Sequence, residues 1–182
     1  MKLELSPKTV GVFGSGADRH DELARDVGGA LAELGVNLLT GGGGGVMTSV
    51  SETFTTERRT RGICIGIIPC ASEKDRRTPK PGYPNRFVEL AIHTHLPYSG
   101  EQGMDDLSRN HINVLSCAVA IALPGGPGTA AEAALAVKYA KPIVAYSRDP
   151  SLIEHFPESI LRVDNIDDVK RFLRAHLGGL GE

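Results

Sequence analysis

Short apolar runs alternate with longer amphipathic segments along the whole chain. The runs are rich in Val, Ile, Leu and Ala, and such runs are typical of strands that are buried on both faces. The strands predicted in this way span residues 9–13, 36–40, 63–68, 87–92, 117–123 and 142–146. Between them, apolar residues recur at intervals of three and four, which predicts helices. The predicted helices span residues 18–34, 46–58, 105–116, 130–140 and 169–177.

Local signals refine several of these boundaries. Asp18 or Asp21 is a candidate N-cap of the first helix, and Gly35 is positioned to end it. Residues 70–86 combine prolines with Lys and Arg, so we expect a long exposed loop there. For residues 152–163 we expect a helical turn followed by an edge strand.

The alternation of strands with helices indicates βαβ units, which place strands in parallel and helices on the faces of the sheet. We therefore expect an α/β protein with a three-layer, Rossmann-like, doubly wound and mainly parallel sheet that has helices on both faces. A chain of 182 residues suffices for one such core, so residues 1–182 are expected to form a single domain.

Three glycine-rich segments directly follow predicted strands, at residues 14–16, 41–45 and 125–128. In parallel sheets, ligands bind beyond the carboxyl ends of the strands, so these loops are expected to converge on one cleft. Glycine lets the backbone approach a ligand, and a helix N-terminus offers free N–H groups to an anion. The candidate phosphate-binding or nucleotide-binding residues are Gly14, Ser15, Gly16, Gly42, Gly43, Gly44, Gly45, Met47, Gly125, Gly126, Gly128 and Thr129.

The loops match neither of two common nucleotide-binding motifs. Residues 14–16 begin a G-x-G-x-x-G motif, but Arg19 occupies the last position, and no acidic residue ends the second predicted strand. A P-loop is excluded because no G-x-x-x-x-G-K-[ST] occurs, and Val46 and Met47 follow the glycine run. The pattern favours a mononucleotide or a similar phosphorylated small molecule.

Glu132 and Arg109 are the candidate charged groups of this cleft. Thr129 and Glu132 have the spacing of a capping box, in which both side chains satisfy the helix's own N–H groups. The same spacing also allows the carboxylate to face a ligand, so both roles stay open. Arg109 precedes the central predicted strand, and it is either a surface or ion-paired arginine or a residue of the cleft.

Composition and charge limit the kinds of partner and environment that the sequence predicts. The balance of 20 Lys and Arg against 22 Asp and Glu argues against a nucleic-acid surface. No apolar run approaches ~18 residues, so we expect no membrane span. Cys64, Cys70 and Cys117 form no C-x-x-C pair and are expected to be buried thiols in a reducing cytoplasm. His93 and His95 lack an obvious third ligand, so no metal site is predicted.

The segment 124–132 matches P-G-G-x-G-T-x-x-E, and the sequence here resembles the LOG proteins, long misannotated as lysine decarboxylases. Residues 42–47 resemble their second glycine motif in a shortened form, and the resemblance extends over about residues 9–146. It implies a Rossmann-like fold and a homodimer or higher homo-oligomer. The implied activity is hydrolysis of the N-glycosidic bond of a nucleoside 5′-monophosphate, such as a cytokinin ribotide or AMP, to free base and ribose 5-phosphate.

Carried over to this sequence, the resemblance implies that Glu132 and Arg109 are catalytic and that Gly125, Gly126, Gly128 and Thr129 hold the phosphate. A carboxylate can stabilise an oxocarbenium-like ribose, and no metal or cofactor is required.

The residues around Arg109 depart from the LOG pattern. LOG enzymes carry H-x-R-K, whereas this chain has Leu107-Ser108-Arg109-Asn110. The run from Arg109 to Ser116 resembles a sister branch that includes the molybdenum cofactor carrier proteins, which hold a molybdopterin phosphate without chemistry. The presence of Glu132 favours hydrolysis as the main hypothesis. The alternative is a non-catalytic carrier or sensor, with molybdenum cofactor or another phosphorylated molecule as its cargo.

Overall fold

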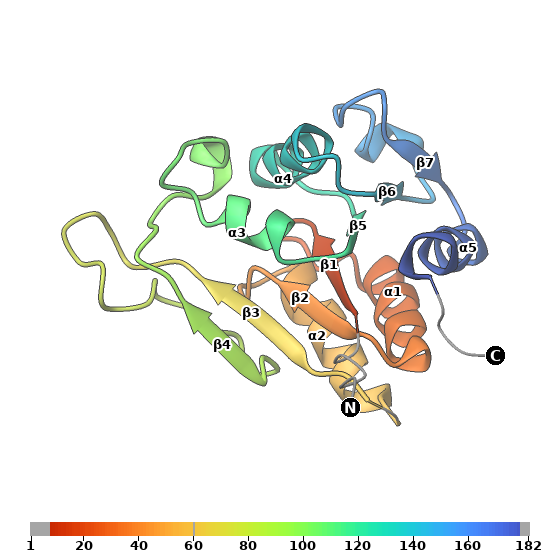
Figure 1. Ribbon diagram of the computed structural model, residues 1–182, viewed down its shortest axis with the longest axis horizontal. Helices are drawn as coiled ribbons and strands as arrows, with labels where there is room; N and C mark the ends of the chain where they lie inside the picture. The colour runs from red at the N-terminus through yellow and green to blue at the C-terminus, as the bar shows by residue number, and fades with distance from the viewer. Residues whose placement is uncertain (1–7, 60, 179–182) are drawn as a thin grey trace, which may run out of the picture.

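In the computed structural model, which describes residues 8–59 and 61–178, the strands form one seven-stranded sheet (Figure 1). The strand order is β4-β3-β2-β1-β5-β6-β7, and every neighbouring pair is parallel. This confirms the predicted parallel sheet. The strands are β1 Thr9–Phe13, β2 Asn37–Thr40, β3 Cys64–Ile68, β4 Leu90–His93, β5 Val119–Ala122, β6 Ile143–Tyr146 and β7 Leu161–Val163.

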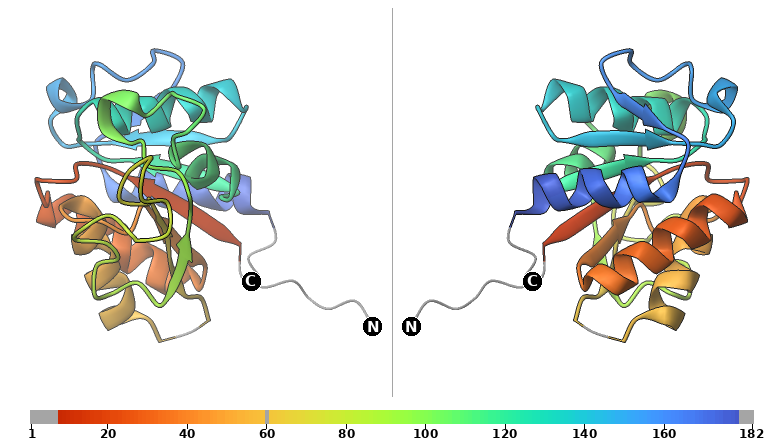
Figure 2. Two further views of the ribbon diagram at one scale, coloured as in Figure 1. Left: turned by 90° about the vertical axis from the view of Figure 1, so that its left-hand side faces the viewer. Right: turned by 90° about the vertical axis from the view of Figure 1, so that its right-hand side faces the viewer.

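Helices cover both faces of the sheet, which confirms the three-layer, Rossmann-like class. One buried cluster joins the sheet to α1, α2 and α5, and a second joins it to α3 and α4. In Figure 2, β6 lies between α4 and α5. None of the helices in the described residues has the length and apolar character needed to cross a membrane. The helices are α1 Asp21–Leu34, α2 Val46–Glu57, α3 Asn110–Leu115, α4 Pro127–Lys138 and α5 Ile166–Leu177, with 3-10 turns η1 Gly100–Gln102 and η2 Pro150–Leu152.

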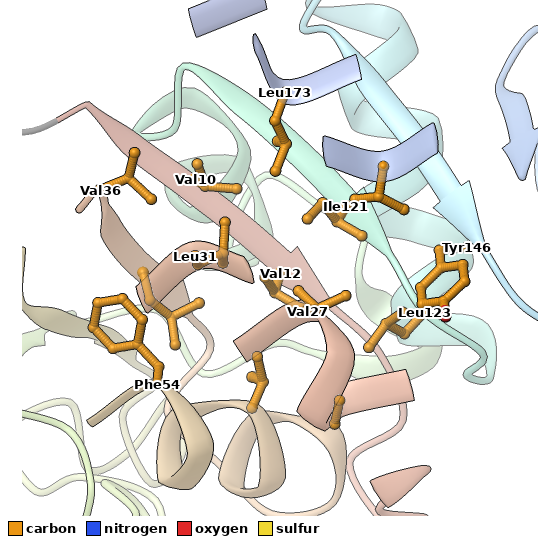
Figure 3. Close-up of a cluster of buried hydrophobic side chains, with 14 of the residues drawn as sticks. Val10, Val12, Val27, Leu31, Val36, Phe54, Ile121, Leu123, Tyr146 and Leu173 are labelled. Atoms are coloured by element: carbon orange, nitrogen blue, oxygen red, sulfur yellow. The ribbon is translucent and has the colours of Figure 1, made fainter. Parts of the chain in front are cut away.

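The larger cluster holds α1 and α2 against the centre of the sheet (Figure 3). Val10 and Val12 of β1 lie against α1, where Val27 and Leu31 are fully buried, and Phe54 of α2 is buried beside them. Burying a side chain of this size stabilises the fold by roughly 1.5–3 kcal/mol. The apolar face predicted for the first helix is therefore the one that fixes it to the sheet.

Small side chains dominate the opposite face, beneath α4. Ala120 and Ala122 of β5 face Ala133 and Ala136 of α4, and all four are fully buried. Because alanine contributes little volume, the helix can approach the sheet closely. This close approach fixes where α4 begins relative to the carboxyl end of β5.

The chain reverses its direction of winding at the centre of the sheet. It runs outward from β1 through β2 and β3 to β4, then returns to place β5 on the other side of β1. At such a switch point, the two connections leave in opposite directions and open a crevice at the carboxyl ends of the strands. In this protein, the crevice lies between the loops that follow β1 and β5.

Several predicted boundaries were wrong for local reasons. Helix α1 begins at Asp21 after His20, which has a left-handed conformation and provides no side-chain cap, so neither Asp18 nor Asp21 is the N-cap. Gly35 ends α1 in the left-handed conformation, as expected. Strand β4 starts three residues later than predicted because Asn85 closes a turn, accepting the N–H of Phe87 on its side chain at 3.0 Å.

The predicted helix 105–116 is shorter than expected, since α3 spans only Asn110–Leu115. The Ser108 hydroxyl accepts the N–H of Asn110 at 3.2 Å, and this local bond replaces a helical one. Arg109 therefore stands at the N-cap of α3 instead of inside a helix.

Ser15 joins the two sides of the crevice to α2 through its backbone N–H and C=O groups. Its N–H donates to the carbonyl oxygen of Pro124 after β5, at 3.0 Å, and its carbonyl accepts the N–H of Val46 at 2.9 Å. Gly45, the N-cap of α2, packs directly against this carbonyl with φ at 59° and ψ at −131°. A side chain at Gly45 would overlap the Ser15 carbonyl and would also require a conformation that other residues rarely adopt.

We expect Gly45→Ala to lower the free energy of unfolding by at least about 3 kcal/mol, because strain and overlap with backbone atoms act together. Urea denaturation measures the change. Gly82→Ala is the matched control, since Gly82 also has a positive φ, of 85°, but a Cβ there would meet nothing within 4 Å. It should lose only about 1–2 kcal/mol. Equal losses in both variants would show that the contact with Ser15 is unimportant.

Candidate functional site

A cleft of about 320 Å³ lies at the carboxyl ends of β1 and β5. This volume is near the lower end of the roughly 300–1,000 Å³ typical of small-molecule sites, and it suits a mononucleotide-sized ligand better than a dinucleotide. The cleft is lined by Val12, Phe13, Gly14, Ser15, Gly16, Ala17, Gly41, Met47, Tyr83, Ser99, Gly100, Arg109, Asn110, Gly126, Pro127, Gly128, Thr129 and Glu132.

One end of the cleft is the N-terminus of α4. Its N-cap is Gly126, in an extended conformation, so no side chain caps the helix. Pro127 has no N–H, and the first helical hydrogen bond runs from Ala130 to the Gly126 carbonyl at 3.1 Å. The helix thus provides no acceptor for the N–H groups of Gly128 and Thr129. These groups and the helix dipole together make this end suitable for an anion.

The start of α4 excludes the capping-box hypothesis for Glu132. A capping box needs Thr129 at the N-cap, but Pro127 begins the helix and makes Thr129 its third residue. Proline is favoured at this first position because its φ already suits a helix. The Glu132 carboxylate is consequently not used to cap α4 and can accept hydrogen bonds from other parts of the protein or from a ligand.

The other end of the cleft holds a buried cluster of Glu132, Arg109 and Asn113. Glu132 is 7% exposed and Arg109 is 4% exposed. The Oε1 atom of Glu132 accepts from Asn113 Nδ2 at 2.7 Å and from Arg109 Nη1 at 3.4 Å. Arg109 is therefore a cleft residue paired with Glu132, and the surface alternative for it is wrong.

Burial controls the electrostatics of this cluster. It raises the pKa of Glu132, while the Arg109 charge and the Asn113 hydrogen bond oppose the increase. The Arg109 guanidinium lies flat against Gly41, where any side chain would overlap it. Arg109 Nε is buried and has no hydrogen-bond partner within the described part of the chain. The cluster is a polar site in which the charges are only partly satisfied by the protein.

The structure brings most of the predicted site residues into the cleft lining. They come from the β1 loop, the start of α2, α3 and the start of α4, as the doubly wound topology requires. The predicted residues that line the cleft are Gly14, Ser15, Gly16, Met47, Arg109, Gly126, Gly128, Thr129 and Glu132.

The predicted residues Gly42, Gly43, Gly44, Gly45 and Gly125 are not in the lining, and their contacts are with the protein itself. The Gly43 carbonyl accepts from the side chains of Thr48 and Asn85, both at 2.9 Å. The Gly125 carbonyl is bonded to His155 Nε2 at 3.0 Å. In the glycine run, it is Gly41 that reaches the cleft.

Sequence reasoning missed several residues of the site. Asn113 could have been found, because it lies four residues after Arg109 and so on the same face of a helix. Tyr83 and Gly100 come from segments that show only loop character, and no periodic pattern indicates that they reach the cleft. His93 ends β4, and the described residues contain no cluster of three or more potential metal ligands.

Fold and cleft geometry together define a Rossmann-like protein with a small cleft at the switch point of its sheet. The chain belongs to the SLOG cluster4 family, whose sequence profile matches residues 7–172. An uncharacterised protein of Archaeoglobus fulgidus is 31% identical over 147 residues, which cover 80% of this chain and 83% of that protein.

Two solved structures share this fold over almost their whole length. The molybdenum cofactor binding protein of Rippkaea orientalis is 28% identical with a TM-score of 0.73, covering 96% of this chain and 100% of that one. The molybdenum cofactor carrier protein of Chlamydomonas reinhardtii is 26% identical with a TM-score of 0.68, covering 94% and 98%. The present chain is thus similar to a protein that binds molybdenum cofactor and to one that carries it.

The raised pKa of Glu132 leads to a pH-dependence test. The folded protein keeps the Glu132 proton to higher pH than the unfolded chain does, so this group lowers stability as the pH rises above about 4.5. We expect the unfolding free energy of the wild type minus that of Glu132→Gln to fall between about pH 4 and pH 7, as measured by urea denaturation.

Glu33→Gln is the control of opposite sign. Lys170 lowers the pKa of Glu33, so the corresponding difference should rise with pH. A flat or rising difference for Glu132→Gln would contradict the assigned direction.

Proposed function

We propose that this protein binds a phosphorylated small molecule in the cleft and carries it without chemical change, with molybdenum cofactor as the leading cargo. The uncapped N-terminus of α4, which opens into the cleft, is the observation that carries the proposal. Molybdenum cofactor includes a phosphate ester, and this helix end offers the N–H groups and the dipole that a phosphate requires. The similarity to two molybdenum cofactor proteins over nearly the whole chain supports the same cargo.

The polar cluster fits such a cargo as well. Phosphate at the start of α4 leaves the remainder of the ligand near Glu132 and Arg109, which both line the cleft. A pterin has N–H donors and ring acceptors, and the carboxylate and guanidinium are complementary to them. The buried Arg109 Nε, which lacks a partner in the described residues, is consistent with a site completed by a polar ligand.

The direct test is to purify the protein from cells that make molybdenum cofactor, oxidise any bound pterin and measure its fluorescence. The carrier proposal expects a pterin phosphate bound in near-stoichiometric amount. Its absence, together with no stabilisation of the protein by phosphate compounds, would reject the proposal.

Gly126→Asp tests the phosphate end. A Cβ at Gly126 meets nothing within 4 Å and φ there is −90°, so a substitution causes no backbone strain and no overlap at the Cβ. The carboxylate would cap α4 and repel an anion, so we expect an unchanged or higher thermal midpoint and at least about tenfold weaker phosphate binding, measured by calorimetry.

The control for this variant is Gly126→Asn, which occupies similar space and caps the helix without a charge. It should weaken phosphate binding less than the aspartate does. If both variants bind phosphate as the wild type does, the start of α4 is not the anion site.

A second candidate is the hydrolysis of a nucleoside 5′-monophosphate. The specific observation in its favour is that Arg109 and Glu132 form a buried pair in the cleft, 3.4 Å apart. A carboxylate at this place can stabilise the oxocarbenium-like ribose that forms as the base leaves. Glu132 and Arg109 would then be the catalytic residues, and no metal would be required.

Incubation with common nucleoside monophosphates, followed by chromatography of the free base, decides between the two candidates. If the protein is a hydrolase, Glu132→Gln should reduce base release by at least about 10²-fold while it still binds phosphate. If the protein only carries its ligand, the wild type releases no base from any nucleotide, and hydrolysis is rejected.

A further inference from the structure

Asn113 is a buried polar residue that does not itself line the cleft. It lies on α3, is fully buried, and its backbone N–H donates to the Arg109 carbonyl at 3.1 Å. This spacing of four residues places Asn113 behind Arg109 on the same face of the helix. From there its side chain reaches across to α4, which packs against α3.

The Asn113 amide is the nearer of the two partners that hold Glu132. Its Nδ2–Oε1 distance is 2.7 Å, whereas the Arg109 Nη1–Oε1 distance is 3.4 Å and exceeds the usual range for a strong bond. The guanidinium is itself held by Gly41 packing and by a 3.2 Å contact with Asn110 Oδ1. The amide therefore determines the orientation of the carboxylate.

Asn113 directs its amide donor to Glu132 and leaves its own carbonyl oxygen unpaired among the described residues. An ionised carboxylate only accepts hydrogen bonds, so the amide must turn its NH₂ group toward Glu132. Its Oδ1 atom is then left buried without a hydrogen-bond partner among the described residues. An unsatisfied buried acceptor is unfavourable for folding, so the hydrogen bond to Glu132 is made at a cost to the asparagine's own carbonyl oxygen. The arrangement is consistent with a functional demand on Glu132.

The second oxygen of Glu132 is the one available to a ligand. Oε1 is occupied by Asn113 and Arg109, and Oε2 has no hydrogen bond within the described residues although Glu132 lines the cleft. Thr129 and Glu132 are three residues apart on α4, a rise of about 4.5 Å on nearly the same face. One helix therefore presents its N-terminal N–H groups and, one turn further on, a carboxylate oxygen.

We propose that Asn113 is a positioning residue that holds Oε1 of Glu132, so that Oε2 accepts a hydrogen bond from the phosphorylated ligand. The ligand class is a phosphate compound with a hydroxyl or N–H donor about one helical turn from its phosphorus atom. Sugar phosphates and phosphorylated heterocycles belong to this class, and inorganic phosphate does not. The inference rests on the proposed function, because it assumes that phosphate binds at the start of α4.

The inference is tested by calorimetry with two probes, one large enough to reach Glu132 from the start of α4 and one too small to do so. Ribose 5-phosphate carries hydroxyl donors that can reach Glu132, whereas inorganic phosphate occupies only the helix end. We expect Asn113→Leu to weaken ribose 5-phosphate binding by about tenfold, the usual effect of losing one charge-assisted hydrogen bond, and to change phosphate binding less than twofold. Asn113→Ala, which needs no extra space, should show the same selective loss.

Ser51→Ala is the matched control, since Ser51 is also a fully buried polar residue and lies on α2 outside the cleft. It should leave both affinities unchanged. Equal weakening of both probes by the Asn113 variants would indicate general damage and overturn the inference, as would no weakening of either. If the wild type binds neither probe, the proposed function fails.

A measurement without ligand distinguishes failure of the positioning role from failure of the proposed function. The Glu132 carboxyl carbon can be titrated by NMR, with its signal identified by its absence in Glu132→Gln. The Asn113 hydrogen bond lowers the pKa of Glu132, so the titration midpoint should move upward in both Asn113 variants and stay in place in Ser51→Ala. An unchanged midpoint in folded Asn113 variants overturns the positioning role, whether or not the wild type binds phosphate.

Discussion

The two backbone hydrogen bonds of Ser15, one from its N–H and one to its C=O, are the constraint on which the site depends. They connect the end of β1 to the loop after β5 and to the first residue of α2. Because β1 and β5 are neighbours at the switch point, this one residue holds together the loop after β1, the loop after β5 and the start of α2. Backbone groups make both bonds, so the bonds do not depend on the identity of the Ser15 side chain.

The glycines of this protein divide into two groups with different physical roles. Gly126 and Gly128 leave the start of α4 open toward the cleft. Gly45 and Gly43 instead let backbone and side chains approach one another, at the Ser15 carbonyl and at Tyr83. Gly41 belongs to both groups, since it lines the cleft and accommodates the Arg109 guanidinium. A run of glycines can thus build a site mainly by permitting close packing around it.

The polar cluster of Glu132, Arg109 and Asn113 is costly to bury compared with the apolar clusters around it. A buried carboxylate and guanidinium lose hydration, and their mutual attraction across 3.4 Å only partly offsets this loss. The cluster also contains buried polar atoms without partners in the described chain. Proteins keep such groups where function needs them, and the position at the carboxyl ends of the strands is where ligands bind in this class of fold. The cluster and the open helix end give the cleft two chemically different ends, with N–H donors at the start of α4 and a carboxylate acceptor at Glu132.

Local pattern in the amino-acid sequence was sufficient for the sheet, the main helices and the position of the cleft, because strand and helix periodicities are short-range properties. It also singled out Arg109 and Glu132 as candidates. Tertiary structure decided that the Glu132 carboxylate bonds to Asn113 and Arg109, because these partners come from another part of the chain. The start of α4 at Pro127 is by contrast a local signal that the sequence contains. Tertiary structure likewise decided that Gly41 lies against Arg109 and that Asn113, whose spacing from Arg109 is visible in the sequence, reaches Glu132 on α4.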